Sequence, residues 1–340
     1  MVNVVDLESY VKGVIPSEVP SSYGMEALKA QAVCARSYAY IQMMHNKYEA
    51  YGAHVDDSVN FQVYNKQNQT PETVAAVDET KGQVLSYKGD IIETYYYSTS
   101  YGHTGDYEAW NLDKDAYGYL QGVWVRSEEN PIDLSDEKSF LDYISNVDSA
   151  CYESDLKYFR WNTVLDFQGK DETLLHTIAD RKEHQPETIS YYKDASKTEK
   201  TDSCSNFGSL QAIKVVKRNQ SGVILELELD FQNGAVSVQS EYNMRAILGC
   251  GITNISLLDG SSVEMSILPS AYISIQAKGD GTYAVLGGGY GHGIGMSQNG
   301  AQKLCGQGFD YKRILNYFYQ DTELTELYQP QNVTKEEGGA

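Results

Sequence analysis

The sequence predicts an α+β fold with two lobes, a cleft between them, mixed sheets and a central helix of small residues. The chain has 340 residues, 41% of them apolar. At about 150 residues per domain, that length favours two lobes. One long stretch has apolar residues at helical spacing, whereas later stretches alternate as strands do. Both patterns in one chain indicate an α+β protein.

The lobes are assigned from the change of character along the chain. We expect residues 1–110 and 270–328 to form a core lobe with the active cleft, residues 111–269 to form an inserted second lobe, and residues 329–340 to be a tail. Residues 105–208 are charged and rich in loop-forming residues, and a polar stretch runs from Lys193 to Ser209. This composition is typical of an insertion.

The first elements lead to the central helix. Residues 6–18 are predicted to form a short apolar segment that ends in a turn, and residues 20–22 to cap the next helix. A helix is predicted over residues 25–45, where apolar side chains recur at helical spacing. These side chains belong to Leu28, Ala32, Ala35, Ala39 and Met43. The alanines let a neighbouring backbone approach closely.

Two cations lie on this helix. Lys29 and Arg36 are seven positions apart, so two helical turns bring them to nearly the same side. A solvated face explains Lys29 equally well. Arg36 lies among Ala, Val, Cys and Tyr residues, which favours burial with a partner.

The remaining elements follow from periodicity and turn residues. We predict helices over residues 72–80, 242–248, 297–303 (or from 299) and 310–319, and strands over residues 84–87, 91–99, 210–216, 223–229, 235–238, 272–275 and 283–286. The strand over residues 91–99 runs into a hydroxyl-rich stretch, residues 98–104. Such strand ends commonly carry binding groups.

Charge and composition exclude several classes of function. The formal net charge is −20, with 27 basic and 47 acidic residues, which disfavours nucleic acid and anionic membranes as partners. No apolar run approaches the roughly 20 residues of a spanning helix. The first residues lack the pattern of a signal peptide. The 28 tyrosines suit sugar rings or peptides, and half-buried strand positions equally well.

The cysteines indicate neither a disulfide framework nor a metal site. Five of them are scattered along the chain without a C-x-x-C pair. One or two bridges are compatible with an exported protein. Cys34, in the predicted central helix, is expected to be a small buried residue rather than a nucleophile.

Glu18 is the carboxylate best placed for acid catalysis. It stands between Pro16 and Pro20 and is bordered by apolar residues, so we expect it in a stiff turn. Apolar surroundings favour the protonated form of a carboxylic acid, whereas a nearby Arg36 or Lys29 favours the charged form. An ordinary exposed loop glutamate is the alternative interpretation.

A glycine-rich run near the end of the chain contains Gly287, Gly288, Gly289, Gly291, Gly293 and Gly295. It lacks both phosphate-loop patterns, G-x-G-x-x-G and G-K-[ST]. Its glycines let backbone approach a bulky ligand and leave Tyr290 and His292 prominent. The alternative is a crossing of two backbones with His292 hydrogen-bonded in the core.

Five blocks of the sequence together resemble the stage II sporulation protein D family. They are Tyr10-Val-Lys-Gly-Val-Ile-Pro-Ser-Glu18, Glu26-Ala-Leu-Lys-Ala-Gln-Ala-Val-Cys-Ala-Arg36-Ser-Tyr, Tyr97-Ser-Thr-Ser100, Gly289-Tyr-Gly-His-Gly-Ile-Gly-Met-Ser-Gln298 and Ile314-Leu-Asn-Tyr-Phe-Tyr319. The blocks occur in family order over nearly the whole chain. Residues 111–208 resemble the family only loosely.

The resemblance implies a lytic transglycosylase that cuts the β-1,4 bond between N-acetylmuramic acid and N-acetylglucosamine in peptidoglycan, preferably in strands without stem peptides. It implies that Glu18 is the catalytic acid. It further implies that the groups around the acid hold the substrate: Arg36, Tyr97, Ser98, Ser100, His103, His292 and Gln298. A single carboxylate suffices because the muramoyl 6-hydroxyl is an internal nucleophile.

The same resemblance sets expectations for cofactors, partners and location. Some members carry a Cys/His zinc cluster before a Gln-Val-Tyr segment, but here Val55 and Phe61 occupy that region, so we expect no metal and no cofactor. Tyr101 stands before Gly102, where the family usually has two glycines. The implied partners are glycan strands, a peptidoglycan amidase and membrane-anchored proteins of the engulfment machinery, with no nucleic acid.

The expected location is extracytoplasmic, at the cell surface or between two membranes, and this sequence lacks the signal or anchor segment of an exported precursor. A non-catalytic amidase enhancer is the alternative function, because relatives with that name are credited with stimulating an amidase. A hydrolase of another polysaccharide is a third, and would yield reducing ends. Glu18 favours the enzyme.

Overall fold

The computed structural model describes residues 2–56, 61–64, 68–128 and 132–328. The chain divides into two compact units, which are treated separately below. Unit 1 comprises Met1–Thr94, Phe309–Ile314 and Asp321–Ala340, and unit 2 comprises Tyr95–Gly308 and Leu315–Gln320. The lobe boundaries and the cleft expected from the sequence stay predictions, and the predicted tail, residues 329–340, lies outside the described residues.

Unit 1 is mainly helical. Its elements are α1 (Leu7–Glu18), η1 (Ser21–Tyr23), α2 (Met25–His45), η2 (Glu49–Tyr51), α3 (Pro71–Glu79), β1 (Gln83–Tyr87), β2 (Asp90–Ile91) and β15 (Glu323–Glu326). Strand β1 lies between β15 and β2 in a three-stranded antiparallel sheet. The helix α9 (Tyr311–Phe318) begins in unit 1 and ends in unit 2.

The small residues of α2 form the centre of unit 1. Apolar side chains of α1, α2 and α3 pack into one core, among them the fully buried Val14, Leu28, Ala32 and Val77. The helix predicted over residues 25–45 is confirmed at both ends. The predicted cap is wrong, because residues 21–23 form η1 and Gly24, with a φ of 90°, precedes the helix without a side-chain cap.

The hairpin is only partly as predicted. The helix expected over residues 72–80 is α3, and the first strand is β1. The second strand does not run over residues 91–99, because β2 ends at Ile91. Beyond it the Thr94 hydroxyl donates to the Cys34 carbonyl of α2 at 2.7 Å, which holds this segment against the helix instead of β1.

Unit 2 holds the remaining elements. These are β3 (Tyr96–Tyr97), η3 (Tyr107–Trp110), α4 (Lys114–Tyr117), α5 (Glu137–Ile144), β4 (Trp161–Asp166), α6 (Asp171–His184), β5 (Ile189–Tyr192), β6 (Lys200–Thr201), β7 (Leu210–Arg218), β8 (Ile224–Phe231), β9 (Gly234–Val238), α7 (Glu241–Gly249), β10 (Ile252–Leu257), β11 (Ser262–Val263), β12 (Ile273–Ala277), β13 (Thr282–Gly287), β14 (Met296–Ser297) and α8 (Gln298–Gly306). The strands and helices predicted between residues 210 and 319 are all present, with small shifts at their ends.

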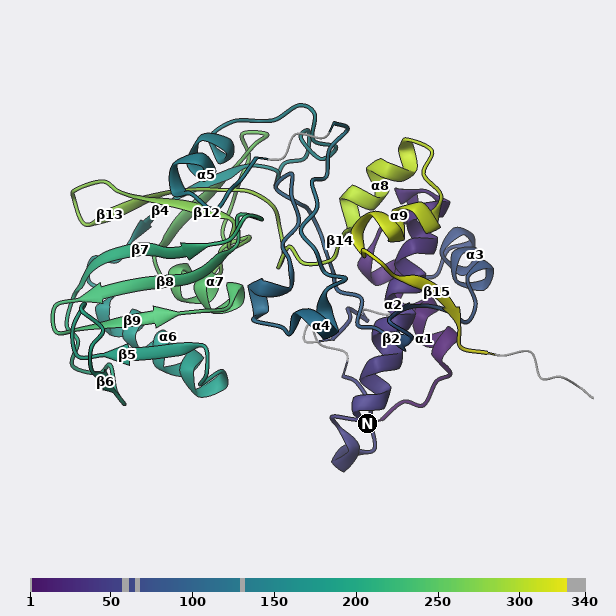
Figure 1. Cartoon of the computed structure of the whole chain (residues 1–340), viewed down its shortest axis with the longest axis horizontal. Helices are drawn as coiled ribbons and strands as arrows, with labels where there is room; N and C mark the ends of the chain where they lie inside the picture. The colour runs from purple at the N-terminus through teal and green to yellow at the C-terminus, as the bar shows by residue number, and fades with distance from the viewer. Residues whose placement is uncertain (1, 57–60, 65–67, 129–131, 329–340) are drawn as a thin grey trace, which may run out of the picture. The chain divides into compact units, whose positions relative to one another are not determined.

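Two five-stranded antiparallel sheets dominate unit 2. One has the order β11-β10-β4-β13-β12 and the other β6-β5-β9-β8-β7, and the strands of the second lie side by side in Figure 1. Buried side chains from both sheets and from α6 and α7 form one hydrophobic core. A separate short parallel pair joins β14 to β3. The expected α+β class is therefore confirmed, with the sheets mainly antiparallel.

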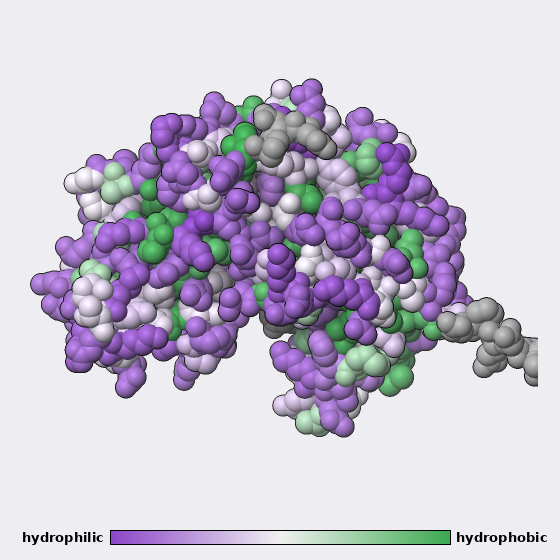
Figure 2. All heavy atoms as spheres, in the orientation of Figure 1, coloured by the Kyte–Doolittle hydropathy of each residue, from purple (hydrophilic) through white to green (hydrophobic). Residues whose placement is uncertain are grey.

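Hydrophilic residues cover most of the face drawn in Figure 2, and hydrophobic residues are scattered among them. None of the five cysteines is joined to another by a disulfide bond, and Cys34, Cys151 and Cys204 are buried. Cys34 lies in the core of unit 1, as expected for a small buried residue. Within the described part of the chain, no helix combines the length and apolar character needed to cross a lipid bilayer.

Candidate active site

Glu18 is the last residue of α1 and is half-buried. Its Oε1 accepts a hydrogen bond from the backbone N–H of Val63 at 2.8 Å. The predicted turn is wrong, since the helix continues through Pro16. A proline in the last turn removes only one helical hydrogen bond, so the helix tolerates it. The helix ends at Glu18 because Val19 precedes Pro20 and is held extended (φ −137°, ψ 143°).

Tyrosine rings lie beside this end of α1. The ring of Tyr10, two turns before Glu18, stacks on the ring of Tyr64, with centroids 5.6 Å apart and planes 3° apart. A side chain at Gly13 would meet the Tyr64 ring at 2.4 Å, so the glycine admits the tyrosine. Burial raises the pKa of Tyr10, and the nearby Tyr38 and Glu18 add to the rise. Glu18 therefore acts electrostatically on one ring of this stacked pair.

Arg36 is fully buried and forms an ion pair with Glu8 near the other end of α1. Its Nε and Nη2 donate to the two carboxylate oxygens at 2.9 and 2.8 Å. The guanidinium also donates to the carbonyls of Val77 at 3.3 Å and Gln83 at 3.0 Å. The expectation of burial with a partner is confirmed. Direct contact with a substrate, which the resemblance implied, would require breaking one of these bonds.

Lys29 is on the same helix but pairs differently. Its Nζ lies 2.9 Å from Glu26 and 2.8 Å from Glu79, which is half exposed. The cationic strip predicted on α2 is therefore neutralised at both positions by carboxylates of unit 1. Lys29 occupies the periphery of the unit, whereas Arg36 lies in its interior.

In unit 2, the glycine-rich run crosses another part of the backbone. The chain at Gly289, Gly291 and Gly295 has positive φ values of 82°, 112° and 77°. An added Cβ at Gly289 would lie 2.9 Å from the Thr99 carbonyl, and one at Gly295 would lie 2.1 Å from the Tyr95 carbonyl. The structure therefore supports the alternative interpretation of these glycines: they admit the chain's own backbone.

Gly295→Ala is expected to destabilise unit 2 by about 3 kcal/mol, since the methyl group clashes with backbone and the φ value disfavours a side chain. Gly279→Ala is the matched control, because Gly279 has a φ of 83° but open space around it. It should cost only about 1 kcal/mol. All three tryptophans lie in unit 2, so urea unfolding followed by tryptophan fluorescence measures both variants. Equal losses of unfolding free energy in the two variants would show that the close approach to the Tyr95 carbonyl is unimportant.

His292 is held by hydrogen bonds at both ring nitrogens. Its Nε2 lies 2.9 Å from the Tyr96 carbonyl, and its Nδ1 accepts from the N–H of Ile294 at 3.1 Å. Nε2 therefore carries the proton and donates it to the carbonyl. His103 is buried, with Nδ1 bonded to the Thr104 carbonyl. Burial lowers the pKa of each histidine to about 4.

Both imidazoles should therefore remain neutral down to about pH 5, and their ring proton shifts in NMR spectra should not titrate above it. In the unfolded chain a histidine gains its proton near pH 6.5. Stability from these two residues is thus complete above about pH 6.5 and falls as the pH drops toward about 4. A midpoint near 6.5 for either ring would contradict the environment described.

Two of the sequence blocks that carry the resemblance, residues 97–100 and 289–298, lie together in unit 2. The rings of Tyr97 and His292 have centroids 5.5 Å apart, and β3 pairs with β14 next to Gln298. Most of the predicted substrate groups are nevertheless buried: Arg36, Tyr97, Ser100, His103 and Gln298. Ser98 and His292 are half-buried and reach the surface. Substrate binding by the buried residues stays a prediction.

Sequence reasoning missed Trp110 and Tyr95, which complete this surface. The half-buried Trp110 ring lies 5.1 Å from the His292 ring and 4.8 Å from the Tyr95 ring. Asn299 donates its backbone and side-chain N–H groups to the Ser98 carbonyl, both at 3.0 Å. We call the rings of Tyr95, Trp110 and His292, together with Ser98 of the segment whose Tyr96 carbonyl bonds His292, the aromatic face of unit 2. No local pattern joins Trp110 to His292, since 182 positions separate them.

Sequence reasoning also missed Glu153, a fully buried carboxylate. Its Oε1 accepts from the Ser100 N–H at 3.0 Å and from the Ser297 hydroxyl at 2.8 Å. Its Oε2 accepts from the Ser100 hydroxyl. Burial raises the pKa of Glu153 to about 7, against the lowering effect of these hydrogen bonds. The residue lies in an irregular loop, where no periodicity marked it.

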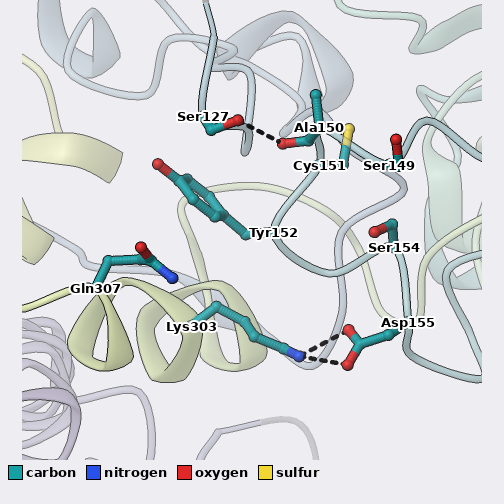
Figure 3. Close-up of a pocket in the computed structure, with 9 residues that line it drawn as sticks. All are labelled: Ser127, Ser149, Ala150, Cys151, Tyr152, Ser154, Asp155, Lys303 and Gln307. Carbon is teal, nitrogen blue, oxygen red and sulfur yellow. Dashed lines mark hydrogen bonds and ion pairs between the residues drawn. The ribbon is translucent and has the colours of Figure 1, made fainter.

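A pocket of about 410 Å³ lies within unit 2. Figure 3 shows it beside α8, where Lys303 Nζ bonds both carboxylate oxygens of Asp155 at 2.7 Å. It is lined by Ser127, Ser149, Ala150, Cys151, Tyr152, Ser154, Asp155, Lys303 and Gln307. None of the site residues predicted from the sequence lines it. In the described ranges, no group of three or more His, Cys, Asp and Glu residues is arranged to hold a metal ion.

Comparison with known families covers both units. Residues 1–87 match the model of the Stage II sporulation protein family, and residues 104–295 match a domain of unknown function, DUF8618. The first match contains Glu18 and Arg36, and the second ends within the glycine-rich run.

Three curated proteins are similar along nearly the whole chain. An amidase enhancer of Bacillus subtilis is 29% identical over 93% of this chain, which spans 40% of that protein. An uncharacterized protein of Brachyspira hyodysenteriae is 27% identical over 96% of the chain and is 68% covered. The stage II sporulation protein D of B. subtilis is 26% identical over 95% of the chain and is 75% covered.

Fold and site define an α+β protein with a glutamate at the end of its first helix and a glycine-lined backbone crossing in its second unit. Both features lie in the blocks that carried the sequence resemblance. The family match over residues 1–87 and the similarity to curated relatives along nearly the whole chain support the stage II sporulation protein D family, and residues 104–295 form a DUF8618 domain.

Proposed function

We propose that this protein is a peptidoglycan lytic transglycosylase with Glu18 as its single acid and base. The observation that carries the proposal is the position of Glu18 in the region matched by the family model, half-buried, with one carboxylate oxygen bonded to the Val63 N–H. A carboxylate fixed by a backbone N–H at the end of a helix suits a residue that protonates a glycosidic oxygen. The family and the names of the relatives support a role in the bacterial cell wall.

The chemistry needs one carboxyl group. A proton on the Glu18 carboxyl group moves to the O4 atom of the leaving N-acetylglucosamine as the bond from that oxygen to C1 of N-acetylmuramic acid breaks. The muramoyl 6-hydroxyl then attacks C1 and returns its proton to Glu18. No water is consumed, and a 1,6-anhydro ring forms. Because the nucleophile belongs to the same sugar, its proximity supplies much of the rate.

The aromatic face of unit 2 is proposed to bind glycan. Its rings offer flat apolar surface for sugar faces, and Ser98 adds a hydroxyl group. The neutral His292 avoids the cost of burying a charge against a neutral sugar. Since glycan strands are long polymers outside the cytoplasm, we propose that the protein acts in an extracytoplasmic compartment.

The products of purified protein on peptide-free glycan strands test this function. The proposal predicts fragments with 1,6-anhydro-muramoyl ends in mass spectra. Fragments with reducing ends would instead indicate a hydrolase. Intact strands would reject catalysis.

A second candidate, supported by the similarity to an amidase enhancer, is a non-catalytic protein that binds glycan and stimulates a peptidoglycan amidase. It predicts intact strands, tight binding, and release of stem peptides by an added amidase at a higher rate. The Glu18→Gln protein separates the two functions, because stimulation of an amidase should survive this change whereas glycan cleavage should not.

A further inference from the structure

Glu153 connects the two segments that support the aromatic face. Ser100 follows β3 and also accepts a hydrogen bond from the Gly102 N–H at 3.2 Å. Ser297 ends β14 and caps α8, where its oxygen accepts from the Gly300 N–H at 3.1 Å. One carboxylate therefore fixes the end of one strand and the start of one helix.

The hydrogen bonds of Glu153 also affect Ser98, through the hydroxyl of Ser297. The single hydrogen of the Ser297 hydroxyl has two acceptors within reach, the Glu153 carboxylate at 2.8 Å and the Ser98 carbonyl at 3.4 Å. A carboxylate is the stronger acceptor, so it holds this hydrogen while it is charged. If Glu153 becomes neutral, the Ser98 carbonyl competes for the hydrogen. The hydrogen bonding of Ser98 thus depends on the state of Glu153.

Few other charges surround Glu153. Tyr97 of β3 and Tyr317 of α9 face it and remain neutral, since burial raises the pKa of each. Among the described residues, the buried Tyr97 hydroxyl has no hydrogen-bond partner. The positive charge of Lys303 on α8 lowers the pKa of Glu153, but Lys303 lines the pocket and forms its ion pair with Asp155. Glu153 therefore has no ion-pair partner of its own in the described part of unit 2.

We propose that Glu153 is a positioning residue for glycan binding: its charged carboxylate holds Ser100 and Ser297, and by keeping the Ser297 hydrogen from the Ser98 carbonyl it keeps Ser98 in the geometry that binds sugar. This proposal rests on the proposed function in one respect, that glycan is the ligand of the aromatic face. The charged form accepts three hydrogen bonds. Adding a proton replaces one acceptor with a donor, and the Ser100 hydroxyl must then reorient.

The test is binding of peptide-free glycan strands by proteins that also carry Glu18→Gln, so that strands stay intact and Glu18 does not titrate. Since Glu153 changes charge near pH 7, the parent should bind about fivefold more tightly at about pH 8 than at about pH 6. His103 and His292 do not change charge in this window. Glu153→Gln imitates the protonated acid, so it should bind with the affinity of the parent at about pH 6 at both values.

Glu153→Ala leaves the N–H and the hydroxyl of Ser100 without this acceptor and leaves the Ser297 hydroxyl with only the Ser98 carbonyl, so it should weaken binding about tenfold or more at both pH values. Recovery of part of that loss by Glu153→Gln separates positioning from general loss of structure, and circular dichroism confirms folding. The matched control is Asp106→Asn. Asp106 is a half-buried carboxyl that accepts hydrogen bonds from Asn219 and Ser221, and no hydrogen bond joins it to Ser100 or Ser297 in the described structure. This control should keep the pH dependence of the parent.

An equal pH dependence in the parent and in Glu153→Gln would overturn the proposal, as would parent binding that is independent of pH. Absence of binding by the parent at both pH values would reject the glycan-binding face together with Glu153. The proposed catalytic function is assessed separately, by cleavage with unaltered Glu18. A protein that binds strands without cutting them would remove that function and leave the role of Glu153 intact.

Discussion

Glu18→Gln should lower the rate at which anhydro ends appear on peptide-free strands by about 10²–10⁴-fold, the usual contribution of a positioned acid and base. Glutamine keeps an oxygen that accepts from the Val63 N–H, so the end of α1 should be unchanged. What disappears is the transferable proton. Strand affinity should change little, because the substitution removes neither a ring nor a backbone contact.

Glu79→Gln is the control for this prediction. It also removes a carboxylate of unit 1, but Glu79 is half exposed and pairs with Lys29 at the edge of the unit. Its cleavage rate should stay within about twofold of the unaltered protein. If Glu18→Gln retained a comparable rate, Glu18 would not be the acid.

Arg36→Met should lower the free energy of unfolding of unit 1 by about 3–5 kcal/mol, the cost of removing one partner of a buried ion pair. Methionine fills the space of the arginine stem but leaves the Glu8 carboxylate with the Gly82 N–H and the Tyr328 hydroxyl as its remaining partners. The Gln83 carbonyl also loses the guanidinium donor, and the Val77 carbonyl keeps only donors from Thr80. Because Glu8 lies near the start of α1 and Glu18 ends it, cleavage should fall as well.

Two optical signals locate this effect. Far-ultraviolet circular dichroism reports the helices of both units, whereas tryptophan fluorescence reports unit 2 alone, which holds all three tryptophans. The Arg36→Met transition should move to lower urea mainly in circular dichroism. Lys29→Met, the matched control on the same helix, should cost less than about 1 kcal/mol. Normal stability with lost strand binding in Arg36→Met would instead favour direct substrate contact.

Several elements were predictable because local physics alone determines them. The central helix has alanines at its buried positions over 21 residues, so its periodicity and its length are both visible. The strands β7 and β8 alternate on either side of a turn that ends at Gly222. The resemblance implied that Tyr97 and His292 of the glycine-rich run belong to one site, and their ring centroids are 5.5 Å apart. The glycines at 289 and 295 lie against the backbone of Thr99 and Tyr95, which supports the interpretation of this run as a crossing of two backbones.

Other features depend on distant partners. Pro16 and Pro20 predicted a turn at Glu18, but packing of Val14 and Ile15 in the core continues α1 through Pro16. The second strand of the hairpin was shortened by the Thr94 bond to α2. Glu153 and Ser100 are 53 positions apart, and only the folded chain joins them. Long-range burial of this kind leaves no periodic pattern in a sequence.

Cleavage in water labelled with heavy oxygen tests the central claim most directly, because an internal nucleophile and an external one give products of different composition. Peptide-free strands are incubated with the unaltered protein in labelled water, and the new ends are weighed by mass spectrometry. The account predicts anhydro-muramoyl ends without the label, and none in the Glu18→Gln protein. One labelled oxygen at each new muramoyl end would show that water attacks the sugar and would contradict the account.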